Sequence, residues 1–513
     1  MSIENVPVII GVGEVCEQVP KDLTTARSVV DLAACAANSA LEDTGSGKRL
    51  IGGIDAVASV RTFSDSSPRY MNSIENVKNM PRAVARRIGA NPEYACYEIS
   101  GGQSPQKLVN EFCRRLAERR FKAVLLTGGE AIASVKAAKR NQVALNWEDS
   151  TAGQIDDRGW GADGILTLQE LENDFLLPGA IYGVLENARR RRLSKTRDEY
   201  ALLMGKLLAP FSKVAANHPT AMFPQAMDAE TIASVSKTNP YIFQPYTRAM
   251  VAKDGVNQAA ALVLTTIGQA RKWGVDESRW IYLKGSCDLK ERTILERPQL
   301  DGSPAMRMAY RTALQRAQVS PDDVDVFDLY SCFPIAVFNA CESLGISPED
   351  PRGLTVTGGL PYFGGPGNNY SMHGIVSVVR HLREIPAGIG VVGANGGFLS
   401  KHSIGVYSRE MPPNGWVFHA DNQIQMALDE APAPDLDMAP EGEAVVESYS
   451  VTYRKGSPAR AHVIGRLCRT NARFLAVTDA SDRETPCLIA DQDFLDKIIE
   501  VTSDGVGNRF SLR

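Results

Sequence analysis

The chain has 513 residues, of which 44% are hydrophobic and 23% charged, as in ordinary soluble globular proteins. This length exceeds one compact core, so two or three domains are expected. The net charge of −4, from 56 basic and 60 acidic side chains, argues against a protein that binds nucleic acid or anionic membranes.

Localisation and metal content follow from simple patterns. No apolar run approaches the ~20 residues that cross a bilayer, and the start MSIENVPVII lacks the basic residues of a signal peptide. The nine cysteines show no paired CxxC spacing and the six histidines are scattered, so neither disulfides nor a zinc site is expected. We therefore expect a cytoplasmic protein with reduced thiols, no metal and no membrane or nucleic-acid partner.

Predicted strands and helices alternate at the start of the chain. Apolar, β-branched runs predict buried strands over 6–15, 54–60 and 123–131. Helical spacing of apolar residues predicts helices over 28–41 and 105–119. Strand–helix–strand alternation with apolar strands favours a parallel sheet that is covered on both faces.

The alternation stops between about residues 134 and 248, which we interpret as a long insertion in the first half. Thr196 and Glu199 have the spacing of a capping box and predict a helix start. The run Arg189–Arg192 has two interpretations, a binding site for a ligand phosphate or, more simply, a solvated helix end.

A second α/β half follows. We expect 1–270 to form the first half and 271–411 the second. Apolar runs and helical spacing predict strands over 259–266, 280–289, 324–330 and 388–394, and helices over 306–317, 334–345 and 373–384.

The composition changes again near the carboxy terminus. Residues 412–443, which include MALDEAPAPDLDMAPEGE, are acidic and rich in alanine and proline, so a linker is expected. Residues 444–513 contain runs of alternating apolar and polar residues, which indicate a small antiparallel β-barrel. Its ten basic and nine acidic residues make it a poor candidate for nucleic-acid binding.

The segment TGGLPYFGGPG, residues 357–367, is rich in glycine and proline and has no charged side chain. Glycine and proline weaken both helices and inner strands, so the segment is either a tight surface turn or a place where backbone approaches a ligand. In the second case its N–H groups would face developing negative charge.

Three segments place such features directly before a predicted helix: EISGGQSPQ, DLYSCFP and the glycine run. Helix amino termini offer free N–H groups and the positive end of the helix dipole. If the three meet, they form a site suited to carbonyl chemistry.

These motifs resemble the thiolase superfamily over about residues 5 to 410. LYSCFPIAVFNACESLGI is similar to the HDCF segment of sterol-carrier-protein-type thiolases, and TGGLPYFGGPG to their SGG…KGHPxG segment. GANGGFLS, from Gly393, is similar to their last Cys-Asn-Gly-Gly loop, and KDGVNQAAALVL to their DGAAA strand. The resemblance implies an α/β duplicated thiolase-like fold, two βαβ-type halves with helices on both faces of the sheets, here followed by a small OB-like β-barrel.

The departures from the thiolase pattern remove its chemistry. The nucleophilic cysteine corresponds to Gly101 or Gly102, the GHP histidine to Gly365, and the cysteine of the last loop to Ala394. Among the catalytic positions, Cys332 alone keeps its residue type. Covalent acyl transfer needs a nucleophile activated by a base, so the ordinary thiolase mechanism is excluded.

This set of replacements resembles the type 1 thiolase-like proteins, commonly labelled acetyl-CoA acetyltransferases. A second resemblance is to thiolase-fold aldolases of steroid side-chain breakdown, which work with an OB-fold partner and use a tyrosine base at the position of Tyr330. By analogy, the carboxy-terminal barrel would be such a partner fused in cis.

Candidate site residues follow from these comparisons. The candidate catalytic residues are Tyr330, Cys332 and His373, and the candidate substrate-binding residues are Gly101, Gly102, Gly358, Gly359, Gly364, Gly365, Asn395, Gly396 and Gly397. Each catalytic candidate has a structural alternative: Tyr330 as a core aromatic, Cys332 as a small buried side chain, and His373 as a helix cap.

Two functions are consistent with this pattern. The first is an enzyme that acts on an acyl-CoA thioester without a covalent acyl-cysteine, as an acyltransferase or in carbon–carbon bond formation or cleavage. The second is an acyl-CoA-binding protein that has lost thiolase activity. No cofactor is expected beyond the coenzyme A of the substrate, and the resemblance implies a homodimer formed through the sheet edge of the first half.

Overall fold

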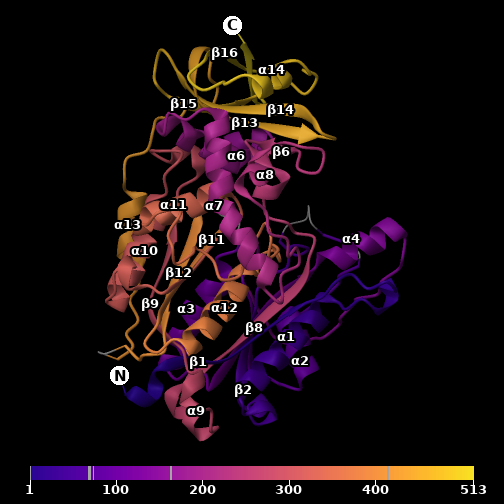
Figure 1. Ribbon diagram of the computed structural model, residues 1–513, viewed down its shortest axis with the longest axis vertical. Coiled ribbons are helices and arrows are strands. Elements are labelled where there is room, and N and C mark those ends of the chain that lie inside the picture. Colours follow the sequence, from indigo (N-terminus) through magenta and orange to yellow (C-terminus); the bar gives the residue numbers. More distant parts are fainter. Residues whose placement is uncertain (1, 67–70, 73, 162–164, 413–414, 513) are drawn as a thin grey trace.

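Two mixed β-sheets and their helices form the body of the molecule, and a barrel caps one end (Figure 1). The computed structural model describes residues 2–512 except 67–70, 73, 162–164 and 413–414. Within the described part of the chain, no helix is long and apolar enough to cross a membrane.

The first sheet has six strands in spatial order β1 (Pro7–Cys16), β8 (Asn257–Thr266), β4 (Ala123–Ala131), β2 (Ile54–Ser59), β3 (Tyr94–Tyr97) and β5 (Asp156–Asp157). β8 runs antiparallel to both β1 and β4, whereas β4, β2, β3 and β5 pair in parallel.

The second sheet has the order β10 (Val326–Leu329), β11 (Ile389–Gly396), β12 (Lys401–Ser408) and β9 (Tyr282–Lys290). β10 and β11 are parallel, and β12 is antiparallel to both neighbours. The expectation of parallel pairing therefore holds for β4, β2, β3 and β5 and for β10 and β11, but not for the strands beside them. Apolar runs indicate that both faces of a strand are buried, but they do not indicate whether it runs parallel or antiparallel to its neighbours.

Helices form three layers around the two sheets. α1 (Val29–Asp43) and α2 (Met80–Ile88) cover the outer face of the first sheet, and α10 (Pro304–Ala317) and α11 (Pro334–Leu344) lie outside the second. α3 (Ser104–Ala117) and α12 (Tyr370–Glu384) lie between the sheets, and α9 (Ile267–Lys272) follows β8. The prediction of helices on both faces is confirmed.

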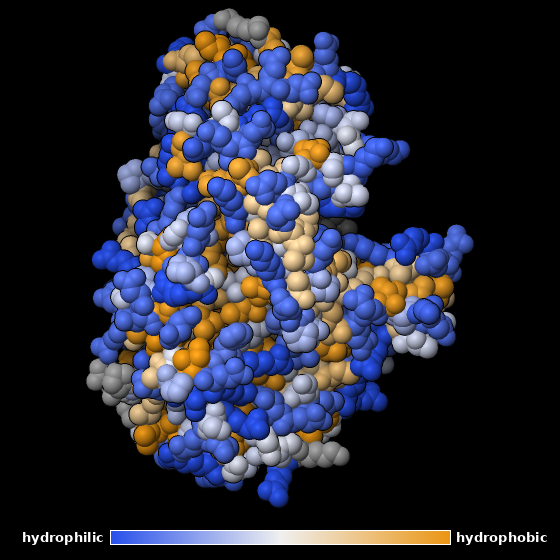
Figure 2. Space-filling view, in the orientation of Figure 1, coloured by the Kyte–Doolittle hydropathy of each residue, from blue (hydrophilic) through white to orange (hydrophobic). Residues whose placement is uncertain are grey.

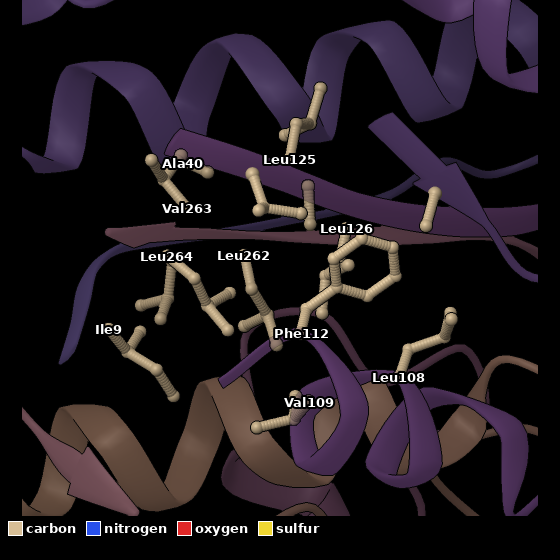
Figure 3. Packing of buried hydrophobic residues seen from close by; sticks show 14 of the residues in the cluster. Ile9, Ala40, Leu108, Val109, Phe112, Leu125, Leu126, Leu262, Val263 and Leu264 are labelled. Carbon is tan, nitrogen blue, oxygen red and sulfur yellow. The ribbon is translucent and has the colours of Figure 1, made fainter. Parts of the chain in front are cut away.

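Side-chain alternation along the strands produces this layering. Figure 3 shows Leu125 and Val263 on the side of α1, and Leu126, Leu262 and Leu264 on the side of α3. α1 begins at a capping box of Ser28 and Asp31. Its alanine-rich face lets β1 approach so closely that a Cβ on Gly11 or Gly13 would overlap the helix backbone.

The insertion, apart from its first helix, forms a helical layer between the body and the barrel (Figure 1). It contains α4 (Ile132–Asn141), α5 (Leu168–Glu172), α6 (Pro178–Arg192), α7 (Arg197–Asn217), α8 (Ala229–Ala233), β6 (Tyr241–Gln244) and β7 (Tyr246–Thr247). The predicted capping box of Thr196 and Glu199 starts α7. α4 lies in an arm that projects from the body (Figures 1 and 2).

The carboxy-terminal domain is a closed five-stranded barrel, as predicted. Its strands follow the order β13 (Gly442–Arg454), β14 (Ser457–Leu467), β15 (Arg473–Val477), β17 (Asn508–Leu512), β16 (Ile498–Ser503) and back to β13. α14 (Thr485–Asp491) separates β15 from β16. The parallel pairing of the third and fifth strands and the helix before the fourth give the OB arrangement.

The segment expected to be a linker differs from that expectation, because it contains α13 (Asn422–Asp429), which packs on α10 and β9. Asp421, just before this helix, accepts hydrogen bonds from Arg316 (2.6 Å) and the Asp288 N–H (2.9 Å). These bonds attach the segment to the second sheet.

Candidate functional site

The predicted helix starts meet at one place, where β10 and β11 end. The N–H of Gly101, before α3, donates to Asn368 Oδ1 (2.9 Å), before α12. Ser371 Oγ, in the first turn of α12, donates to the Gly102 carbonyl (2.6 Å). A Cβ on Gly102 would lie 2.6 Å from the Asn395 carbonyl, at the end of β11. The starts of α3 and α12 and the end of β11 therefore surround one centre.

Gly102 and Tyr330 occupy this centre together. A Cβ on Gly102 would overlap the Tyr330 hydroxyl, so the phenol fills the space that a nucleophilic side chain at position 102 would need. Tyr330 is 9% exposed, and its ring meets the Tyr370 ring edge-on with 5.4 Å between centroids. Within the described residues, the Tyr330 hydroxyl makes no hydrogen bond.

Cys332 and Asn395 lie beside Tyr330 and share a partner in the insertion, Tyr182 of α6. The Tyr182 hydroxyl lies 3.3 Å from Asn395 Oδ1 and accepts a hydrogen bond from the Leu399 N–H (2.9 Å). Asn395 is 2% exposed, and its Nδ2 has no hydrogen-bond partner among the described residues. The centre thus offers an unpaired buried amide donor next to a phenol.

Burial controls the ionisation of the centre. It raises the pKa of Tyr330 well above its usual value and raises the pKa of Cys332 to about 11, although the neighbouring polar groups of Tyr182 and Asn395 act in the opposite direction. Both groups are therefore protonated at neutral pH. They can donate hydrogen bonds, but neither is prepared to accept a proton.

A small cavity adjoins this centre. It is lined by Tyr330, Asn395 and His402 together with apolar residues of α10 and α11, and its volume is about 10 Å³. That volume is about the size of one water molecule, and it does not hold an acyl chain.

The glycine run wraps around the centre, with most of its N–H groups used by the protein. The N–H of Gly358 donates to Thr355 Oγ1 (3.0 Å), that of Gly359 to Thr357 Oγ1 (3.2 Å) and that of Gly365 to the Lys253 carbonyl (2.8 Å). The run needs glycine because Gly358, Gly359 and Gly364 all have positive φ and close neighbours.

The remaining predicted glycines pack against their neighbours. A Cβ on Gly364 would lie 2.6 Å from Gln258 Oε1, whereas one on Gly365 would meet nothing closer than 3.3 Å. A Cβ on Gly396 would overlap Gln103 Oε1, and Gly397 Cβ would meet Ser400. Gly396 thus packs against the start of α3, and Gly397 packs within the last loop.

His373 points away from Tyr330, toward β1. Its Nδ1 lies 2.8 Å from Glu14 Oε2, and Arg380 pairs with the other carboxylate oxygen. Burial tends to raise the pKa of Glu14, but the His373 hydrogen bond and the charges of His373 and Arg380 lower it to about 2. His373 therefore links α12 to β1 through a buried hydrogen bond with Glu14.

Two residues next to the site, Tyr182 and Glu186 of α6, were missed by sequence reasoning. Glu186 is fully buried and accepts hydrogen bonds from Tyr200 (2.5 Å), Tyr246 (2.9 Å) and the Ile335 N–H (2.8 Å) at the start of α11. Neither residue belongs to a motif, and only the insertion's fold brings them here. In the described part of the chain, no group of three His, Cys, Asp or Glu side chains is arranged to hold a metal.

The barrel reaches the same centre through buried contacts. Ser448 Oγ and Tyr449 O of β13 are hydrogen-bonded to Val184 O (2.5 Å) and Asn187 Nδ2 (2.9 Å) of α6, within five residues of Tyr182. The insertion in turn covers β14, β15 and β17, where Gln169 accepts from the Leu475 N–H (3.2 Å) and Asn173 from the Asn508 N–H (2.7 Å).

A second connection runs through two fully buried arginines. Arg473 of β15 donates to the Leu295 carbonyl (2.9 Å), and Arg297 donates to the carbonyls of Phe398 (2.9 Å) and Leu399 (3.1 Å). The barrel thus supports the loop that follows Asn395 and the end of β11.

Comparisons with known proteins agree with this architecture. Residues 423–506 match the family model described as the thiolase-like protein type 1 additional C-terminal domain. The chain is 39% identical to a monomeric SCP2-thiolase-like protein type 1 from Mycobacterium smegmatis, with complete coverage of both chains and a TM-score of 0.85. No match was found among the curated proteins.

More distant structures share the fold alone. An aldolase described as Ltp2–ChsH2(DUF35) is 17% identical, with 79% of this chain and 98% of that chain covered and a TM-score of 0.57. An acetyl-CoA acetyltransferase from Syntrophomonas wolfei is 18% identical, with 79% and 99% covered and a TM-score of 0.55. The chain belongs to the type 1 thiolase-like proteins, whose additional C-terminal domain is the barrel described above.

Proposed function

We propose that this protein binds acyl-CoA thioesters and forms no acyl-enzyme. The observation that carries the proposal is the pairing of Gly102 with Tyr330, because the Tyr330 hydroxyl occupies the place of the thiolase nucleophile. The neighbouring thiol of Cys332 does not replace it, since a thiol with a pKa of about 11 is almost entirely protonated at neutral pH.

Hydrogen-bond donors at the centre support thioester recognition. Asn395 Nδ2 is buried without a partner in the described part of the chain, and the Tyr330 hydroxyl adjoins it. Two such donors suit a carbonyl oxygen. An unpaired buried donor costs about 1–3 kcal/mol, which a bound thioester would recover.

Calorimetry with acetyl-CoA tests this proposal. We expect binding at micromolar affinity, a loss of about tenfold in Asn395→Leu or Tyr330→Phe, and no change in the control Tyr241→Phe. Absence of both heat and thermal shift with any acyl-CoA would refute it.

A second candidate is carbon–carbon bond cleavage or formation beside the thioester carbonyl. The raised pKa of Tyr330 favours it, because the protonated phenol can donate to an enolate oxygen. The α-proton would pass to a base from solvent, since neither Tyr330 nor Cys332 accepts a proton at neutral pH. Exchange of the acetyl-CoA methyl protons with D₂O, followed by NMR, tests this candidate. Exchange that Tyr330→Phe abolishes would establish an enzyme. An exchange rate equal to that in buffer without protein would exclude this candidate and leave acyl-CoA binding as the function.

We also propose that the protein is a monomer, in contrast to the dimer that the thiolase resemblance implies. β5 pairs with the outer edge of β3, and its two residues, Asp156 and Asp157, are both exposed. A short, acidic edge strand discourages pairing with a second sheet. Light scattering on the purified protein should give the mass of one chain at micromolar concentration.

A further inference from the structure

A lysine without a counter-ion lies beside the glycine run. The N–H of Lys253 donates to the Leu360 carbonyl (3.2 Å), and its carbonyl accepts from the Gly365 N–H (2.8 Å). Its Nζ lies 5.1 Å from the centroid of the Phe223 ring and 5.5 Å from that of Tyr362. The backbone bonds and the two rings hold this half-buried side chain in place.

A second cation is close to Lys253, and neither has an acidic partner. Among the described residues, no carboxylate pairs with Lys253 or with the exposed Arg248, because the nearest acidic residue in sequence, Asp254, pairs with Lys136 (2.6 Å). Burial, followed by the positive charge of Arg248, lowers the pKa of Lys253. Two like charges close enough to shift a pKa repel each other, and a bound anion would relieve that repulsion.

The aromatic residues add to this arrangement. Tyr362 is 1% exposed, and its hydroxyl has no hydrogen-bond partner in the described part of the chain. Phe223 is partly exposed and connects to Tyr362 through a backbone hydrogen bond (3.1 Å). A partly exposed ring beside an ammonium that has no acidic partner among the described residues is suited to a nucleotide, which combines a flat base with phosphates.

This cationic patch, Arg248, Lys253 and the ring of Phe223, is connected to the candidate centre. The N–H of Ala252, next to Lys253, donates to the Cys332 carbonyl (3.0 Å). The patch and the candidate centre are therefore on neighbouring segments of the fold.

We propose that this patch binds the phosphate-bearing nucleotide of coenzyme A. The inference rests on the proposed function, since it assumes that an acyl-CoA is the ligand. The ammonium of Lys253 and the guanidinium of Arg248 would hold the phosphates, while the thioester end reaches Asn395 and Tyr330.

Titration calorimetry with three ligands tests the assignment. Acetyl-CoA contains both ends, S-acetylpantetheine lacks every phosphate, and adenosine 3′,5′-bisphosphate is the nucleotide end alone. Lys253→Met keeps the packing of the stem on the two rings, and Arg248→Ala alters an exposed side chain. Lys136→Ala is the matched control, because that lysine already has a carboxylate partner.

We expect Lys253→Met to weaken acetyl-CoA and the bisphosphate about tenfold each, as loss of a charge-assisted contact does, and to leave S-acetylpantetheine unchanged. Arg248→Ala should act in the same direction, and Lys136→Ala should have no effect. Raised salt should weaken the two phosphate ligands in the wild type and have less effect in Lys253→Met.

The failures of the two proposals are distinguishable. If acetyl-CoA binds and Lys253→Met binds it equally well, the nucleotide site is wrong and the proposed function stands. If the wild type binds the bisphosphate but neither thioester, the patch is an anion site and the proposed function is wrong. No binding of the bisphosphate by the wild type would overturn the nucleotide site.

Discussion

At the scale of single residues, the substitution that removes the nucleophile also creates the space for Tyr330. The motif comparison placed the thiolase cysteine at Gly101 or Gly102 and the HDCF histidine at Tyr330, and the structure selects Gly102 as the residue against Tyr330. The comparison did not predict their overlap, because the contact joins residues 228 positions apart and depends on how α3 and the end of β10 pack.

Adding a side chain at position 102 should therefore destabilise the protein. We expect Gly102→Ala to lower the free energy of unfolding by about 1–3 kcal/mol, as overpacking does. Gly52→Ala is the control, because a Cβ there meets nothing within 4 Å. Equal urea midpoints for the two variants would contradict the close contact.

Glu186 gives a prediction about pH. Burial raises its pKa to about 7, above the 4.5 of an exposed glutamate, despite three hydrogen bonds. Because the folded pKa is the higher one, its contribution to stability is complete below pH 4.5 and is lost as the pH rises through 7.

Between pH 5.5 and 8, we expect the stability of the wild type to fall by about 2 kcal/mol relative to Glu186→Gln. Urea unfolding of both proteins at the two pH values measures this difference. A difference between wild type and variant that does not change with pH would show that Glu186 titrates elsewhere.

At the scale of elements, the sequence predicted the helices and strands that carry strong periodicity or caps. Ser28 and Thr196 do start helices, and the apolar runs at 6–15 and 123–131 do form strands. β5 could not be predicted because it has only two exposed residues, and strand direction in β8 depends on partners far away in sequence.

The arginine run at the end of α6 shows a different limit. The run is the last turn of α6, as the helix-end interpretation expected, and Arg191 and Arg192 are exposed. It is not merely solvated, however, because all four arginines pair with carboxylates from distant segments. Arg190, which is 2% exposed, makes two hydrogen bonds of 2.7 Å to Asp493 between α14 and β16. These acidic partners lie in other parts of the fold, so the run alone gave no indication of them.

Arg190 and Arg191 form a matched pair for experiment. We expect Arg190→Ala to cost about 2–3 kcal/mol of unfolding free energy, because the buried guanidinium donates hydrogen bonds to Asn187, the Lys195 carbonyl and the half-exposed Asp493. Arg191→Ala should cost less than about 1 kcal/mol, since that pair with Asp496 is exposed. Similar losses in the two variants would argue against Arg190 as the anchor of the barrel.

At the scale of the whole molecule, the barrel is integrated into the body. β13 pairs with β6 of the insertion, and Ile464 and Leu475 of the barrel belong to the hydrophobic cluster of the second half. A β-rich carboxy-terminal domain was visible in the sequence as alternating residues, but its docking was not, because both surfaces are assembled from separate segments.

Truncation after Gln425 should therefore damage the body as well as remove the barrel. It exposes the partners of Ile464 and Leu475 and leaves the carbonyls that accept from Arg473 unpaired. We expect a lower melting temperature and weaker acyl-CoA binding. A truncated protein with unchanged melting and unchanged affinity would show that the barrel is an independent module.

The central claim is that acyl-CoA binds at a centre that has no nucleophile. Mass spectrometry of one sample, incubated with acetyl-CoA and recorded under native and then denaturing conditions, tests it most directly. Under native conditions, we expect the mass of the chain plus one acetyl-CoA. Under denaturing conditions, we expect the mass of the bare chain. A stoichiometric acetyl adduct that survives denaturation, on Cys332 or elsewhere, would contradict it.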